Sequence, residues 1–175
     1  MDNIAAPYQS EYHKFYQTYV DHSYSKDVST YYEQQRTEFI QFLRSIPKDR
    51  HNYSYAPGKW TLKGLLRHII DAERIFSYRA MAIARGDQAS LPGMDQDDYM
   101  KVADDSGNSF ADLVQEFDLL RQSNILMFKN FSKDAFLRTG TASDAKVSVR
   151  ALLYIIIGHL EHHITIISER YIEHV

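Results

Sequence analysis

The 175-residue chain contains no cysteine, and glycine (7) and proline (4) are scarce. The absence of cysteine excludes disulfides, cysteine-ligated zinc and a cysteine nucleophile, so any reacting thiol must come from a cofactor. The few glycines and prolines fall mainly between periodic segments, which leaves room for long uninterrupted helices.

An excess of one charge is also missing, because 20 Lys and Arg oppose 23 Asp and Glu for a net charge of −3. Without a dense basic tract, no nucleic-acid partner is expected. Residues 1–10 lack the basic and apolar regions of a signal peptide. No apolar run approaches the roughly 20 residues of a membrane span. The sequence therefore predicts a soluble cytoplasmic protein with no membrane partner.

The apolar residues that are present recur with helical spacing nearly everywhere, and no stretch shows a convincing two-residue alternation. This pattern predicts an all-α protein, an antiparallel four-helix bundle formed by one domain over residues 1–175. Residues 1–26 are expected to form an N-terminal extension that packs on the bundle. The four long helices are expected at 28–46, 61–85, 110–131 and 148–171.

Capping residues mark the ends of these predicted helices. Thr61 and Ser148 are suitable N-caps, and Ser109 with Asp112 suits a capped start for 110–131. Gly86 is suited to the position just after the helix 61–85. These signals agree with the boundaries that the apolar spacing predicts.

The N-terminal segment 8–22 carries Tyr8, Tyr12, Tyr16 and Tyr19 at helical spacing. We expect this tyrosine stripe to pack against the body or a partner chain. Contact with a ligand is the alternative.

Residues 87–108 form the one long polar and acidic connection. Such connections are usually functional or mobile. Asp95, Asp97 and Tyr99 are therefore candidates for lining a functional site, with a solvated connection as the alternative.

Three histidines lie on apolar faces of two predicted helices. His159 and His163 are one turn apart on the face of the last helix, so both rings can reach one ion. His68 occupies a similar inward line on the helix 61–85. A single histidine on an apolar face is more often a hydrogen-bonded core residue, but three of them favour a metal site.

Three neutral imidazoles would leave coordination positions open for water or substrate, whereas structural zinc is normally closed by four protein ligands. The ligand type alone admits zinc, nickel, copper or iron. His162 points about 100° away from His163 and is left out of the ligand set. Glu161 lies two residues from His159, unlike the glutamate of a His-Glu-x-x-His protease, and is a poor general base.

Three further expectations concern residues near this cluster. Glu73 is expected to form an ion pair with Arg74 or with another helix, and the alternative is that it orients an imidazole. Gly158 indicates either a close helix approach or space beside the ion. The remaining histidines, at positions 13, 22, 51 and 174, are expected to be solvated.

The order and spacing of these motifs resemble the DinB/YfiT-like superfamily, from about Tyr12 onward. The matching segments are Tyr55-Ala-Pro-Gly-Lys-Trp60, Thr61-Leu-Lys-Gly-Leu-Leu-Arg-His68-Ile-Ile-Asp-Ala-Glu-Arg74, Tyr78-Arg79, Ala84-Arg-Gly-Asp87, Leu91-Pro-Gly-Met-Asp-Gln-Asp-Asp-Tyr99, Gly158-His-Leu-Glu-His-His163 and Glu169-Arg-Tyr171. Met94 stands where the family commonly has phenylalanine.

The resemblance implies a four-helix bundle, often a homodimer, that binds a divalent metal, usually nickel or zinc. By motif position the metal ligands are His68, His159 and His163. Family members are described as metal-dependent hydrolases, and others resemble S-transferases that use bacillithiol or mycothiol. Some are related to a thiol-dependent isomerase.

The leading hypothesis is an enzyme in which the metal activates a nucleophile toward a small-molecule substrate. It would act as a hydrolase or as an S-transferase with bacillithiol or a similar thiol as co-substrate. The alternatives are a non-catalytic bundle that binds metal and a small ligand, and a bundle stabilised by a structural metal. The sequence assigns no catalytic residue beyond the metal ligands.

Overall fold

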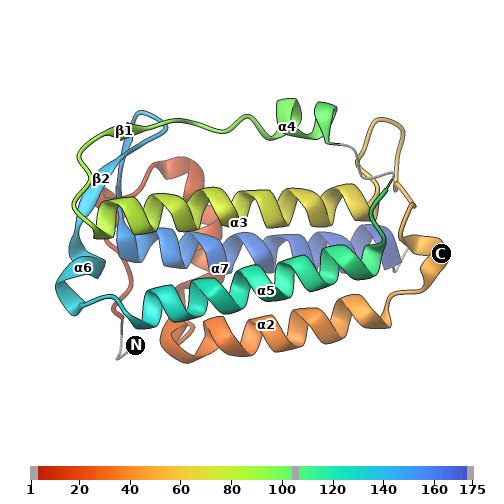
Figure 1. Ribbon diagram of the computed structural model, residues 1–175, viewed down its shortest axis with the longest axis horizontal. Coiled ribbons are helices and arrows are strands. Elements are labelled where there is room, and N and C mark those ends of the chain that lie inside the picture. Colours follow the sequence, from red (N-terminus) through yellow and green to blue (C-terminus); the bar gives the residue numbers. More distant parts are fainter. Residues whose placement is uncertain (1–3, 104–106, 173–175) are drawn as a thin grey trace.

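Four long helices lie side by side in the computed structural model, which describes residues 4–103 and 107–172 (Figure 1). Helix α7 packs against α3 and α2, and α5 packs against the same two helices from the other side. The predicted four-helix bundle is confirmed. Its members are α2 (Val28–Ser45), α3 (Leu62–Ala84), α5 (Phe110–Lys129) and α7 (Val149–Ile166).

Two helices run in each direction. Helices α2 and α7 run one way, and α3 and α5 run the other way (Figure 1). Although α3 and α5 are consecutive long helices, they are parallel because the connection between them returns along the length of the bundle. This connection carries the short helix α4 (Gln96–Val102) over α3.

The predicted caps are present. The side chains of Thr61, Ser109 and Ser148 each accept a hydrogen bond from the backbone N–H three residues later. Gly86 has φ of +87°, a conformation that glycine adopts without strain. The π-helical turn η4 (Ile167–Ile172) continues α7, so the last helix reaches the predicted end.

The bundle interior is mainly apolar but contains a buried ion pair. Arg121 of α5 is completely buried and binds Glu73 of α3 through two hydrogen bonds of 2.7 and 2.8 Å. Asn124 and Tyr32 also donate to Glu73. The ion-pair interpretation of Glu73 is confirmed, and its partner is on another helix. The apolar spacing of 110–131 did not reveal Arg121, because charged residues are usually assigned to solvent.

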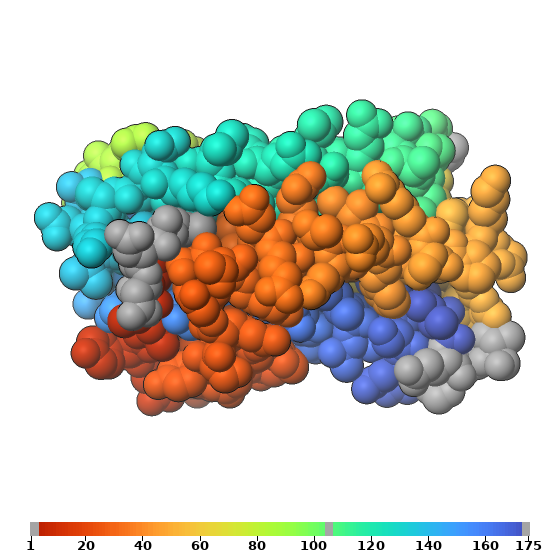
Figure 2. Space-filling model, turned by 90° about the horizontal axis from the view of Figure 1, so that it is seen from below, coloured from red at the N-terminus to blue at the C-terminus, as the bar shows by residue number. Residues whose placement is uncertain are grey.

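The prediction of one helix over 8–22 is wrong. The segment forms η1 (Gln9–Glu11), η2 (Lys14–Tyr16) and α1 (Gln17–Tyr24), separated by extended backbone at Tyr12 and His13. Helix α1 packs against α7. Figure 2 shows this segment beside α2, with the later part of α7 visible next to it.

A small sheet was missed because its strands are too short to show an alternation. It contains β1 (Ser90–Leu91), β2 (Thr139–Ala142) and β3 (Ala145–Ser148), with β1 parallel and β3 antiparallel to β2. The hairpin turn, Ser143–Asp144, has positive φ at both residues, as in a type I′ turn. Helix α6 (Lys133–Leu137), also unpredicted, precedes the hairpin.

Helix α7 with η4, Val149–Ile172, is long and apolar enough to cross a membrane by length and composition alone. However, 67% of its most apolar window is buried inside the bundle. This burial is typical of a core helix, because α1, α2, α3 and α6 all pack against α7.

Candidate metal centre and adjoining cavity

The three histidines singled out by the sequence meet between α3 and α7. The Nε2 atom of His159 lies 3.2 Å from Nε2 of His68 and 3.1 Å from Nε2 of His163. All three side chains are buried, and one ligand nitrogen from each lies within 4.8 Å of the others. The group could therefore hold a metal ion.

The packing of α3 against α7 explains this convergence. His159 and His163 are separated by one turn, so their rings lie on the same face of α7. That face packs on α3, where His68 lies on the facing side with its ring centroid 5.2 Å from His159. Trp60 also packs against the ring of His68, at 5.0 Å between ring centroids.

The surroundings keep these imidazoles neutral. Burial lowers the pKa of His68 to about 4, although Asp97 partly opposes this effect. Burial, followed by repulsion from neighbouring histidines, lowers the pKa of His159 and His163 well below the usual range. Neutral imidazole is the form that ligates transition metals, so the cluster is ready for a cation at neutral pH.

The distances fit a single ion. Two imidazole nitrogens at about 2.0–2.1 Å from one zinc ion are about 3.0–3.4 Å apart, depending on the angle between them. The two contacts of His159, 3.2 and 3.1 Å, fall in this range. Nδ1 of His163 is buried without a hydrogen-bond partner in the described part of the chain. Coordination through Nε2 would place the imidazole proton on this atom. The fit to an ion therefore rests on the positions of the three Nε2 atoms.

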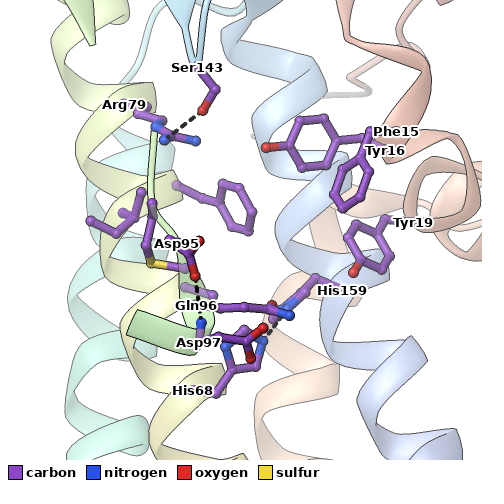
Figure 3. Close-up of a pocket in the computed structure, with 14 residues that line it drawn as sticks. Phe15, Tyr16, Tyr19, His68, Arg79, Asp95, Gln96, Asp97, Ser143 and His159 are labelled. Atoms are coloured by element: carbon purple, nitrogen blue, oxygen red, sulfur yellow. Dashed lines mark hydrogen bonds between the residues drawn. The ribbon is translucent and has the colours of Figure 1, made fainter. Parts of the chain in front are cut away.

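The cluster opens onto a cavity of about 340 Å³, whose wall includes His68 and His159 (Figure 3). Within residues 4–103 and 107–172, no carboxylate belongs to the metal-binding group. Positions on an ion held by the three imidazoles would therefore remain accessible from the cavity.

Two of the three predicted loop residues line this cavity. Asp95 and Asp97 lie on its wall, whereas Tyr99 is exposed to solvent outside it. The carboxylate of Asp95 accepts the backbone N–H groups of Asp97 and Asp98, at 2.9 and 3.1 Å. This N-cap fixes the start of α4 at the cavity, so the acidic connection contributes to the site.

The aromatic part of the wall comes from two elements. Tyr16 and Tyr19, next to Phe15, reach the cavity from the N-terminal segment, and Phe76 comes from α3. Tyr19 packs edge-on against His159, with 5.2 Å between ring centroids. The packing interpretation is confirmed for Tyr16 and Tyr19, which pack against the core and also line the cavity, whereas Tyr8 is exposed.

Arg79 is the functional candidate that sequence reasoning missed. It lies on α3, eleven residues after His68, and lines the cavity although only 4% of the residue is exposed. Eleven residues correspond to about three helical turns, so both residues share one face. A charged residue at that spacing on an apolar face was the available signal.

Glu161 and His162, which lie between two of the histidines in sequence, do not belong to the histidine cluster. The carboxylate of Glu161 accepts hydrogen bonds from Tyr31 and Gln35 on α2, as its orientation away from His159 predicts. The ring of His162 is 5.2 Å from that of His163 but does not belong to the metal-binding group.

The remaining histidines divide into two kinds. His13 and His22 are exposed, as expected. The prediction for His51 is wrong, because its ring is half-buried and stacked on Phe110 with 3.9 Å between centroids. His174 lies outside the described residues.

Comparison with known proteins identifies the family and the fold. The family model described as the DinB superfamily matches residues 31–167. The solved structure of YfiT from Bacillus subtilis superposes with a TM-score of 0.72 and 14% identity, covering 93% of this chain and 89% of that chain. YfiT is described as "a probable metal-dependent hydrolase with an unusual four-helix bundle topology". No curated protein is significantly similar in sequence.

Proposed function

Because this chain belongs to the DinB superfamily, we propose that it is a metal-dependent hydrolase whose three histidines hold one divalent ion. The observation that carries the proposal is the convergence of three buried imidazoles, two of which line a cavity. The description of YfiT as a probable metal-dependent hydrolase supports it. The substrate is a small molecule, since the cavity of about 340 Å³ is near the lower end for ligand sites.

The chain supplies ligands and walls for this chemistry. A divalent ion on three imidazoles acidifies water toward neutral pH and polarises a carbonyl or phosphoryl oxygen. His68, His159 and His163 would hold the ion in their neutral forms. Asp97 lies beside His68 at the cavity (Figure 3), where its carboxylate can accept a proton from water. The packed rings of Tyr19 and Phe76 exclude bulk water from one side.

Zinc and nickel are the proposed metals, because imidazole suits both and the cluster contains neither thiolate nor carboxylate. The same open positions would accept a thiolate. Since the chain lacks cysteine, S-transfer would require a soluble thiol such as bacillithiol. We keep S-transfer, ligand binding without turnover and a structural metal as competing outcomes of the tests.

We also propose that the protein is a cytoplasmic homodimer. The burial of its most apolar helix supports a soluble protein. Light scattering on purified protein measures the mass of the assembly, and a mass near 20 kDa would contradict the dimer.

The first test is elemental analysis of protein expressed without a histidine tag. We expect about one zinc or nickel ion per chain, lost in His68→Ala and His163→Ala. His162→Ala is the matched control, because it removes a neighbouring imidazole outside the group. A metal-free parent after reconstitution with either ion, or retention in the variants, would reject the site.

The second test is turnover by the metal-loaded protein. Hydrolysis of a panel of activated esters and amides, abolished in His163→Ala, would support the hydrolase. Product formation only with bacillithiol and an electrophile would indicate the S-transferase instead. A structural ion is indicated if the metal stabilises the protein but supports neither activity. In that case the spectrum of the cobalt-substituted protein should not respond to azide or thiol.

A further inference from the structure

Arg79 carries a buried charge without a carboxylate partner. The residue is 4% exposed, and its guanidinium Nη2 donates to the carbonyl of Pro92 at 2.6 Å and to Oγ of Ser143 at 3.1 Å. Within the described residues, 4–103 and 107–172, Arg79 forms no ion pair. A buried charge is costly unless it is paired. Arg79 therefore has capacity to bind an anion.

Within the described residues, Nε and Nη1 of Arg79 have no hydrogen-bond partner. Arginine has five N–H donors, and only those on Nη2 have partners here. Yet no atom of Arg79 is both fully buried and unsatisfied, since His163 Nδ1 is the one such side-chain atom in the described part of the chain. Arg79 lines the cavity and also a much smaller pocket beside the β2–β3 hairpin. Of these two spaces, the cavity of about 340 Å³ is the one large enough for an organic anion.

The cavity is polarised along its length. Figure 3 shows Arg79 and Ser143 at one end and His68 with Asp97 at the other. Between them the wall combines aromatic rings, including Phe76 on α3, with the polar side chains of Asp95 and Gln96. Arg79 itself packs against Phe76, with Cζ 5.9 Å from the ring centroid. A ligand spanning the cavity would place an anionic end and a reacting end at different sites.

We propose that Arg79 and Ser143 form a subsite for the carboxylate of the substrate. The Nη2 donors are engaged by Pro92 and Ser143, so an Nε–H or Nη1–H group would donate to a carboxylate oxygen, and the Ser143 hydroxyl can supply a second donor. This inference deepens the proposed function, on which it rests for the identity of the reacting end. The substrate class is a small acyl compound with a carboxylate at one end and an ester or amide near the histidines.

A singly charged carboxylate suits this end better than a phosphate monoester. One guanidinium is available, and Asp95 and Asp97 also line the cavity. A phosphate carries about −1.5 to −2 charges at neutral pH and would be repelled more strongly by these carboxylates. The acidic residues also direct the anion away from the α4 side and toward Arg79.

Arg79 could instead only fasten the connection before α4 to the β2–β3 turn. Its hydrogen bonds to Pro92 and Ser143 would serve that purpose without any ligand. Arg138 provides a matched control, because its guanidinium binds the carbonyl of Ala84 outside the cavity. Comparing a variant of Arg79 with a variant of Arg138 distinguishes the loss of anion binding from the loss of a guanidinium–carbonyl contact.

The test compares hippurate (N-benzoylglycine) with its neutral analogue hippuramide by calorimetric titration. The parent is expected to bind hippurate at least tenfold more tightly than hippuramide. Arg79→Met should remove this preference, Ser143→Ala should reduce it severalfold, and Arg138→Met should leave it unchanged. Equal affinity of the parent for both compounds, or an unchanged preference in folded Arg79→Met, would overturn the subsite.

Two further measurements keep the result independent of folding and of the metal. The Arg79 Nε–H resonance, assigned with Arg79→Lys, should shift with hippurate and not with hippuramide even if Arg79→Met fails to fold. In metal-free His163→Ala the preference for hippurate should persist. Its disappearance there would place the carboxylate on the metal and reject the subsite. Because neither measurement requires turnover, failure of the hydrolase proposal remains distinguishable.

Discussion

A Cβ atom on Gly158 would lie 1.7 Å from the backbone carbonyl oxygen of Tyr19. Position 158 of α7 therefore cannot carry a side chain while α1 packs against it in this way. Ser23 of α1 strengthens the same contact by donating a hydrogen bond to the carbonyl of Tyr154, at 3.0 Å. Of the two interpretations of Gly158, close helix approach is confirmed, and its partner is the N-terminal helix.

Gly158→Ala is expected to destabilise the protein by about 1–3 kcal/mol or more, because overpacking against backbone cannot be relieved by a side-chain rotation. This loss should exceed the roughly 1 kcal/mol that alanine gains in helix propensity. The measurement is urea unfolding. Gly64→Ala is the control within α3, since its nearest obstacle is the flexible end of Met100 at 3.3 Å. Equal stabilities of the two variants would contradict the contact.

Glu73→Gln should cost about 3–5 kcal/mol, because it leaves the charge of Arg121 buried without its partner. Both side chains are almost completely shielded from solvent. Asp118→Asn, which removes the partner of the half-buried Arg36, should cost less than about 1 kcal/mol. Unfolding of both variants in urea gives the comparison, and similar losses would show that burial of the first pair has little effect.

Acidification is expected to weaken the packing of the N-terminal segment on the bundle, because it protonates Glu11. Burial raises its pKa, but hydrogen bonds from Arg150 and Ser148 outweigh burial and lower the pKa from 4.5 to about 2. A depressed folded pKa means that this stabilisation is complete above pH 4.5 and is lost as the pH falls toward 2.

The measurement is the urea midpoint of the parent and of Glu11→Gln between pH 7 and pH 2.5. The parent should be more stable at neutral pH, and the difference should shrink below pH 4.5. A constant difference across this range would exclude Glu11 as the titrating group.

Removal of the metal should lower the thermal midpoint of the parent. An ion that binds only the folded state contributes about 2.7 kcal/mol when its free concentration is 100 times Kd. His163→Ala should be insensitive to chelator, since it lacks one of the three ligands. Scanning calorimetry with and without chelator measures the shift, and an equal response of the variant would place the ion elsewhere.

The histidine cluster could be predicted because periodicity alone fixes which residues share a helix face. His159 and His163 are on one face for any α-helix through them, and only the docking of that face on His68 needed the structure. Arg79 and Arg121 were not found by the same reasoning. Both lie on buried faces, but a charge in a helical pattern is assigned to solvent unless its partner is known.

The short elements depend on contacts that the sequence does not show. Strand β1 has two residues and exists because Ser90 and Leu91 pair with β2, about fifty residues later. Helix α4 has about two turns, and the side chain of Asp95 caps its N-terminus. The polar connection around it shows no helical periodicity. In the N-terminal segment, tyrosine spacing suggested one helix, and extended backbone at Tyr12 interrupts it.

Tyr16 and Tyr19 lie outside residues 31–167, the part of the chain that the family model matches. The histidines lie inside it. The candidate metal ligands and one wall of the cavity thus lie on separate stretches of the chain. Substitutions at Tyr16 and Tyr19 would therefore reshape the cavity while leaving all three histidines in place.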